Sequence, residues 1–143
     1  MMKPMYTARA TATGGRAGHV ETDDGKLALD LSPPREMGGD GRGTNPEQLF
    51  AAGYAACFHG ALMYVAGQDK TDVAGSKVAG EVAIGPNDAG PGFKLGVVLT
   101  VDVPTMTQAQ AEALAEKTHQ VCPYSNATRS NIDVELKVTG GRA

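Results

Sequence analysis

One long segment constrains the fold of this chain more than any other feature. Leu49 to Gly67 contains no Asp, Glu, Lys or Arg and is rich in Ala and Gly. It is almost long enough to cross a bilayer, but it has little Leu, Ile or Val and carries Tyr54, His59 and Tyr64 in its middle. This composition favours a helix buried in a core or an interface over a membrane span.

The length and charge of the chain limit its possible domain organisation and partners. The chain has 143 residues, and we expect a single domain over residues 1–143. Its net charge is −3 and its 13 Lys and Arg form no basic block, which argues against nucleic acid or an anionic membrane as the main partner. The N-terminus lacks the apolar run of a secretory signal, so we expect a cytoplasmic protein.

The start of the long helix is marked by the run Thr44-Asn45-Pro46-Glu47-Gln48. Asn45 is a good N-cap, proline suits the first helical position, and Glu47 complements the positive end of the helix dipole. We expect the helix to run to about Val65 and to end at Gly67. The dipole alone explains an acidic residue in the first turn, so the pattern favours that role for Glu47. The other interpretation is a carboxylate that holds an arginine in a bidentate pair.

The rest of the chain predicts strands and a second helix. Thr107 is expected to cap a helix that runs through Val121 and is broken by Pro123 directly after Cys122, and a short helical turn is expected from Ser125. Alternating runs between Gly- and Pro-rich turns predict strands. The expected strands are Tyr6–Thr13, His19–Thr22, Lys26–Leu31, Lys77–Ile84, Phe93–Val103 and Ile132–Val138. This order of elements predicts an α+β fold with mostly antiparallel pairing.

Cys57 and Cys122 are the only cysteines of the chain. A lone structural disulfide rarely persists in a reducing compartment, where disulfides are more often transient and catalytic. Cys122 stands at a predicted helix end, where its side chain could swing towards a partner, and this suits a cysteine that resolves a sulfenic acid. The alternative is a thiol that is simply packed under the turn.

Cys57 lies well inside the predicted helix, too far from the N-terminus for the dipole to lower its pKa much. Burial alone would raise its pKa and leave an inert thiol, the commonest fate of a free cysteine. A reactive Cys57 needs a cation, and Arg16 in the glycine-rich turn Gly14–Gly18 is a candidate. From spacing alone four other arginines are equally available: Arg9, Arg35, Arg42 and Arg129.

Two other chemistries use the same cysteines. His119 and Cys122 are three residues apart and share a helical face, whereas Cys57 and His59 are two apart and point to nearly opposite sides. The four residues therefore do not readily bind one zinc ion, and we expect no bound metal. A Cys-His hydrolase with His59 or His119 as the base is conceivable, but no local nucleophile motif supports it.

Two long stretches of the sequence, each with one cysteine, resemble a known family. They are Gly43–Phe58 and Val121–Val134, and the shorter stretches Tyr6–Arg16 and Leu31–Gly39 also match. Together they are similar to the organic hydroperoxide resistance proteins, the peroxidase branch of the OsmC/Ohr (osmotically inducible protein C) superfamily. The run Cys122–Arg129, Cys-Pro-Tyr-Ser-Asn-Ala-Thr-Arg, points to this branch.

The resemblance implies an organic hydroperoxide reductase. Cys57 would be the thiolate that attacks the peroxide, and Cys122 would resolve the resulting sulfenic acid as a disulfide. Arg16 would stabilise the thiolate and polarise the peroxide, with Glu47 orienting Arg16. The expected substrates are organic or fatty-acid hydroperoxides. The expected reductant is external dihydrolipoamide, carried by a lipoylated protein and regenerated by its reductase, with no bound cofactor.

The resemblance also implies an OsmC-like fold, with antiparallel sheets around a central buried helix, in an intertwined homodimer with its active sites at the subunit interface. Four apolar residues are candidates for an acyl-chain pocket, although core packing explains each more simply: Phe50, Phe58, Met37 and Met63. His59 replaces an expected aliphatic residue and should face away from Cys57. The alternative function is a non-enzymatic dimeric stress protein that binds hydrophobic small molecules.

Overall fold

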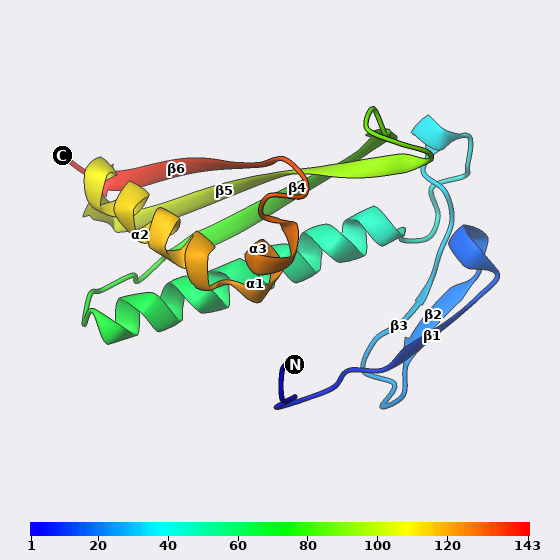
Figure 1. Cartoon of the computed structure of the whole chain (residues 1–143), viewed down its shortest axis with the longest axis horizontal. Coiled ribbons are helices and arrows are strands. Elements are labelled where there is room, and N and C mark those ends of the chain that lie inside the picture. Colours follow the sequence, from blue (N-terminus) through cyan, green and yellow to red (C-terminus); the bar gives the residue numbers. More distant parts are fainter. The chain divides into compact units, whose positions relative to one another are not determined.

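The computed structural model describes residues 1–143 and divides the chain into two compact units, Met1–Leu49 and Phe50–Ala143 (Figure 1). Each unit contains a three-stranded sheet. Helix α1 (Pro46–Gln68) begins in the first unit and continues through the second. The predicted α+β class is confirmed, while the single domain over 1–143 stays a prediction.

The first unit holds a small antiparallel sheet in the order β1 (Ala10–Thr13), β2 (His19–Thr22) and β3 (Ala28–Asp30). β2 was predicted with its observed bounds. The outer strands are shorter than the predicted Tyr6–Thr13 and Lys26–Leu31. The physical reason is that β2 spans only four residues between two turns, so the regular ladder ends with it. Single backbone hydrogen bonds continue past its ends, from the N–H of Asp23 to the carbonyl of Arg9 at 3.1 Å and from the N–H of Leu31 to the carbonyl of Gly18 at 2.8 Å.

The connection from β1 to β2 is a short 3-10 helix, η1 (Gly15–Ala17), which carries Arg16. Two glycines make this tight connection possible. Gly14 has a φ of 74°, in the left-handed region, and a Cβ on Gly18 would lie 1.8 Å from the carbonyl oxygen of Thr13. The local backbone therefore sets where Arg16 leaves the sheet.

The sheet of the second unit has the order β4 (Lys77–Pro86), β5 (Phe93–Thr107) and β6 (Val134–Arg142). β4 and β5 are antiparallel, whereas β5 and β6 are parallel. The pairing is therefore mostly antiparallel, as predicted, with this one parallel pair as the exception. The reason is the connection. Helices α2 (Gln108–Val121) and α3 (Pro123–Thr128) carry the chain back before β6 starts, as a parallel crossover requires.

The N-terminus of α1 forms as its sequence predicts. Asn45 accepts a hydrogen bond from the backbone N–H of Gln48 at 2.8 Å, and Pro46 occupies the first helical position. α2 begins in a similar way, because Thr107 and Gln110 form a reciprocal capping box. Local hydrogen bonding thus determines both helix starts.

The C-terminus of α1 differs from the expectation. The helix runs through Gly67 and ends at Gln68. Lys70 then adopts a left-handed conformation, with a φ of 53°, and the N–H of Thr71 donates to the carbonyl of Ala66 at 2.9 Å. A glycine costs a helix only about 1 kcal/mol relative to alanine, which is too little to end a helix that is held by packing.

The core of the second unit lies between α1, α2 and the sheet. The buried apolar residues of α1 are Tyr54, Phe58, Leu62, Val65 and Ala66. Alternate residues of β5 belong to the same cluster: Val97, Leu99, Val101 and Val103. α1 is long and apolar enough to cross a membrane by length and composition alone. Its buried face packs as we expect of a core helix.

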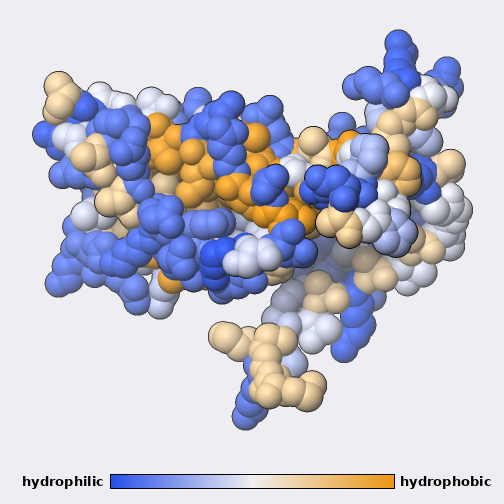
Figure 2. Space-filling view, turned by 45° about the horizontal axis from the view of Figure 1, so that its top comes forward, coloured by the Kyte–Doolittle hydropathy of each residue, from blue (hydrophilic) through white to orange (hydrophobic).

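Apolar side chains also reach the surface of the second unit. Figure 2 shows strongly hydrophobic residues gathered in one continuous area on this unit, with hydrophilic residues around it. Partly buried residues that pack against the core include Val82, Ile132, Val134 and Leu136. Exposed apolar areas of this kind mark interaction surfaces in many proteins.

Candidate active site

The two cysteines meet in the second unit, although they are 65 positions apart in the sequence. Their Sγ atoms are 3.7 Å apart, and both thiols are free. Cys122 is fully buried, whereas Cys57 is partly accessible. A disulfide bond is about 2.0 Å long, so a small rotation of the side chains would bring the sulfurs to bonding distance. The pair has the geometry of a reduced dithiol that can close.

Cys122 stands at the corner between two helices. Its N–H donates to the carbonyl of Thr118 at 2.9 Å as the last bond of α2, and its own carbonyl accepts from Asn126 as the first bond of α3. Between these bonds its backbone is extended, with φ −63° and ψ 124°. α3 begins at Pro123, earlier than the predicted start at Ser125, because proline suits the first position of a helix.

The surroundings of Cys57 disfavour its thiolate. Burial raises the pKa of this thiol above its ordinary value, and the nearby Cys122 raises it further. A hydrogen bond from the backbone N–H of Tyr124 acts in the opposite direction but does not reverse the shift. These surroundings therefore favour the thiol form of Cys57, and a reactive thiolate requires a stabilising positive charge.

Arg16 and Glu47 form a bidentate ion pair within the first unit. Arg16 Nη1 donates to Glu47 Oε2 at 2.9 Å, and Nη2 donates to Oε1 at 2.8 Å. The side chain of Glu47 is 12% exposed and that of Arg16 is 43% exposed. The arginine lowers the pKa of the Glu47 carboxyl. The sequence pattern alone favoured a dipole role for Glu47, but the structure shows the carboxylate oriented on an arginine.

Sequence reasoning missed a buried polar network beside the cysteines. The hydroxyl of Tyr54 lies 2.8 Å from Ser125 Oγ and 3.0 Å from Thr128 Oγ1, and Ser125 Oγ lies 2.7 Å from His119 Nδ1. Burial lowers the pKa of His119, which favours the neutral form of its ring. The available signal was spacing, because Tyr54 and Ser125 each lie three residues from a cysteine.

The four residues predicted for an acyl-chain pocket have different surroundings. Phe58 is fully buried in the core, and Phe50 is partly buried, with its ring centroid 5.9 Å from that of Tyr124. Met37 and Met63 are exposed, at 48% and 55%. Core packing accounts for Phe58, as the sequence suggested, and a shared role for the four residues stays a prediction.

The structure also shows the surroundings of His59 and whether the residues considered for a metal site come together. His59 Nε2 lies 3.0 Å from Ser76 Oγ, in the loop before β4, so its ring makes a hydrogen bond within the chain. His, Cys, Asp and Glu side chains form no group of three or more that could hold a metal ion. The two-Cys, two-His set of the sequence is therefore not assembled.

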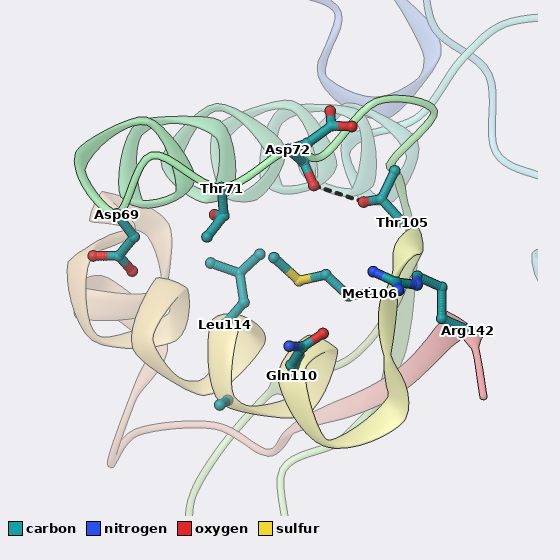
Figure 3. Close-up of a pocket in the computed structure, with 9 residues that line it drawn as sticks. Asp69, Thr71, Asp72, Thr105, Met106, Gln110, Leu114 and Arg142 are labelled. Carbon is teal, nitrogen blue, oxygen red and sulfur yellow. Dashed lines mark hydrogen bonds between the residues drawn. The ribbon is translucent and has the colours of Figure 1, made fainter.

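A cavity of about 470 Å³ lies elsewhere in the second unit, and Figure 3 shows the residues around it. Its lining includes Asp69, Asp72, Thr105, Met106, Leu114 and Arg142. The hydroxyl of Thr105 donates to the backbone carbonyl of Asp72 at 2.6 Å across its rim. Neither cysteine lines this cavity, so it is separate from the dithiol.

Comparison with known proteins identifies the family to which the chain belongs. The sequence pattern described as OsmC-like protein matches residues 39–137. The chain belongs to the OsmC-like family. An organic hydroperoxide resistance protein of Xanthomonas axonopodis pv. citri is 55% identical to this OsmC-like protein over 135 residues, covering 94% of each. The organic hydroperoxide resistance protein OhrB of Bacillus subtilis is 46% identical over 134 residues, covering 94% of this chain and 98% of the relative.

Solved structures agree with the sequence relatives. A crystal structure of an organic hydroperoxide resistance protein from Legionella pneumophila matches this OsmC-like protein with a TM-score of 0.91 and 53% identity, covering 96% of this chain and 99% of the other. A second, from Elizabethkingia anophelis, matches with a TM-score of 0.92 and 48% identity, covering 97% and 99%. The resemblance inferred from the cysteine motifs and the OsmC-like fold are both confirmed.

Proposed function

We propose that this OsmC-like protein is a thiol-dependent peroxidase that reduces organic hydroperoxides to alcohols. The observation that carries the proposal is the contact of two free sulfurs, 3.7 Å apart, between Cys57 and Cys122. The 55% identity to an organic hydroperoxide resistance protein supports the class of substrate. The alternative, a stress protein that only binds hydrophobic small molecules, gives this contact no role.

The first chemical step consumes the peroxide. The Cys57 thiolate attacks the terminal oxygen of R–O–O–H, an S–O bond forms and the O–O bond breaks. The leaving alkoxide takes up a proton to give the alcohol ROH. The sulfur is oxidised to sulfenic acid, and the peroxide is reduced by two electrons.

The second step resolves the sulfenic acid. The Cys122 sulfur attacks the Cys57 sulfur, an S–S bond forms, and the hydroxyl group leaves with a proton as water. A dihydrolipoyl dithiol then reduces the disulfide by thiol–disulfide exchange and is itself oxidised to the cyclic disulfide. A lipoylated protein and its reductase would supply this dithiol in the cell.

Arg16 supplies the positive charge that Cys57 lacks. Its guanidinium stabilises the thiolate and donates hydrogen bonds to the peroxide oxygen. Two features support this assignment: burial raises the pKa of Cys57, and Glu47 holds the guanidinium in a bidentate pair. Glu47 therefore serves as the positioning residue for Arg16.

The active protein is a cytoplasmic homodimer. The apolar area on the second unit supports association with a second copy of the chain (Figure 2). In the dimer each active site lies at the subunit interface. Phe50, Met37 and Met63 contribute the apolar surface that prefers an alkyl chain, with the fully buried Phe58 packed in the core, so organic hydroperoxides react faster than hydrogen peroxide.

The proposal is tested by titrating thiols in the reduced protein after one equivalent of tert-butyl hydroperoxide, with hydrogen peroxide in a parallel sample. We expect rapid loss of both thiols, an intact mass lower by two hydrogens, and faster reaction with the alkyl peroxide. Cys57→Ser should abolish the reaction, because it removes the attacking sulfur. Survival of both thiols in the wild-type protein would exclude the peroxidase and favour the binding protein.

A further inference from the structure

The buried polar network joins three helices around the two sulfurs. Tyr54 belongs to α1, while Ser125 and Thr128 belong to α3, and all three side chains are at most 4% exposed. His119 joins the network from α2 through its hydrogen bond to Ser125. No buried polar side-chain atom of the chain lacks a partner. A fully satisfied buried network of this kind restricts the relative positions of the elements that it joins.

One member of the network, Tyr54, lies on the same helix as Cys57. Tyr54 precedes Cys57 by three residues on α1, so both side chains lie on neighbouring positions of one helical face. The hydroxyl group of Tyr54 forms hydrogen bonds with two hydroxyl groups of α3, those of Ser125 and Thr128. The two helices also approach closely at this point, because a Cβ on Gly53 would lie 2.7 Å from the hydroxyl oxygen of Tyr124.

The start of α3 carries both groups that face the Cys57 sulfur. Cys122 immediately precedes α3 and places its Sγ 3.7 Å away, and the N–H of Tyr124 donates a hydrogen bond to the same sulfur. A shift of α3 along or away from α1 would change both distances together. The position of α3 therefore affects both the stability of the Cys57 thiolate and the formation of the Cys57–Cys122 disulfide.

We propose that Tyr54 is a positioning residue for the cysteine pair. Its hydroxyl anchors α3 on α1 through two hydrogen bonds and thereby holds Cys122 and the Tyr124 N–H at the Cys57 sulfur. The inference rests on the redox role proposed above for the two cysteines. It adds a residue that touches neither peroxide nor sulfur and acts through the helix that it holds.

Tyr54→Phe tests this role with little other disturbance. The substitution removes one oxygen and keeps the ring in the core. Ser125 retains His119 as a partner, and Thr128 retains its bond to the carbonyl of Ser125 at 3.3 Å. No hydroxyl group is left without a hydrogen-bond partner, so the variant is expected to fold.

Thr118→Val is the matched control. Thr118 is also fully buried, and its hydroxyl donates to the carbonyl of Leu114 in its own helix at 2.7 Å. Its side chain links no two helices. The bond from the Cys122 N–H uses the backbone carbonyl of Thr118 and survives the substitution. The control therefore loses a buried hydroxyl without losing the anchor.

The measurement is the effective concentration of the Cys57–Cys122 dithiol, from equilibration of the whole protein with mixtures of reduced and oxidised dithiothreitol. A misplacement of about 1 Å between reacting groups costs up to about 100-fold, so we expect Tyr54→Phe to lower the effective concentration by about 10- to 100-fold. The rate at which iodoacetamide alkylates Cys57 at pH 7 should also change, because the Tyr124 N–H and the Cys122 sulfur, which shift the pKa of Cys57 in opposite directions, move together with α3. Thr118→Val should stay within about twofold of the wild type, because it leaves this geometry unchanged.

Each outcome is decisive. An unchanged effective concentration in Tyr54→Phe, or an equal fall in Thr118→Val, would overturn the inference. If Tyr54→Phe does not fold, Thr128→Val removes one of the two anchoring bonds and should give a smaller fall, and no fall would overturn the inference. Neither assay uses peroxide. A fall in Tyr54→Phe in a protein that consumes no peroxide would refute the proposed function and leave the positioning role standing.

Discussion

Replacement of Arg16 by methionine is the most informative perturbation of the proposed mechanism. It removes the guanidinium and keeps a long side chain. The Arg16 side chain is 43% exposed, and exposed ion pairs contribute only about 0.2–1 kcal/mol. Glu47 remains in the first turn of α1, where the helix dipole still favours its charge. The variant is therefore expected to stay folded.

The expected loss of activity follows from the state of Cys57. An ordinary thiol, with a pKa of about 8.5, is about 3% thiolate at pH 7, and burial raises the pKa of Cys57 above the ordinary value. Cation-assisted cysteines with a pKa of about 6 are about 90% thiolate, a difference of about 30-fold. A more basic thiolate regains about tenfold in nucleophilicity. Loss of a charged hydrogen bond to the peroxide costs about 10- to 150-fold.

The gain of about tenfold in nucleophilicity offsets most of the loss of about 30-fold in thiolate, which leaves about threefold. Multiplied by the loss of the hydrogen bond to the peroxide, this gives a fall of about 100-fold in the rate of peroxide reduction at pH 7. Stopped-flow kinetics with tert-butyl hydroperoxide measure this rate, and alkylation by iodoacetamide as a function of pH measures the pKa of Cys57. Because the thiolate is the reactive form, the alkylation midpoint should move to higher pH in Arg16→Met. Arg42→Met is the control, since Arg42 lies in the same unit and forms no salt bridge.

The refuting result is clear. If Arg16→Met reduces the peroxide within about threefold of the wild-type rate and keeps the same alkylation midpoint, Arg16 is not the source of thiolate stabilisation. An equal fall in Arg42→Met would show a general effect of charge instead. A fall in the melting temperature of Arg16→Met larger than the loss of one exposed ion pair explains would show that the fold, and not the chemistry, had changed.

Three further predictions follow from the same geometry. Cys122→Ser should keep the first peroxide turnover but leave Cys57 as sulfenic acid that excess peroxide oxidises to sulfinic acid, detectable by mass spectrometry. Arg16 lowers the pKa of Glu47 in the folded state, so the ion pair stabilises the fold fully above about pH 4.3, the ordinary pKa of a glutamate. This stabilisation is lost as the pH falls through the pKa of Glu47 in the folded protein. Glu47→Gln should therefore flatten the pH dependence of urea stability in acid by less than about 1 kcal/mol, and an unchanged profile would contradict this. Phe58→Ala should lower the free energy of unfolding by about 3–5 kcal/mol, because Phe58 is fully buried; a loss below about 1 kcal/mol would show that the site collapses.

The sequence determined features that depend on neighbouring residues. The start of α1 at Pro46 and the capping of α2 by Thr107 were readable, because an N-cap uses hydrogen bonds between residues two or three positions apart. The helix after Cys122 was readable in part, since proline and a short polar run favour a new helical turn. The family was also readable from the two cysteine motifs, and the comparisons confirm it.

The tertiary structure decided the features that depend on packing between distant residues. The helix runs through Gly67 because core contacts outweigh the weak helix propensity of glycine. β6 runs parallel to β5 because α2 and α3 carry the chain back across the sheet. Local patterns contain neither the crossover nor the strength of packing.

The candidate site divides in the same way. The residues of each cysteine motif were visible in the sequence, but the 3.7 Å contact of Cys57 with Cys122 and the hydrogen bonds of Tyr54 to α3 are not. These contacts join residues more than 60 positions apart, and only the fold brings such residues together. The sequence alone thus determined which groups could react, and the tertiary structure decided which of them meet, because distance in space is set by packing and not by spacing along the chain.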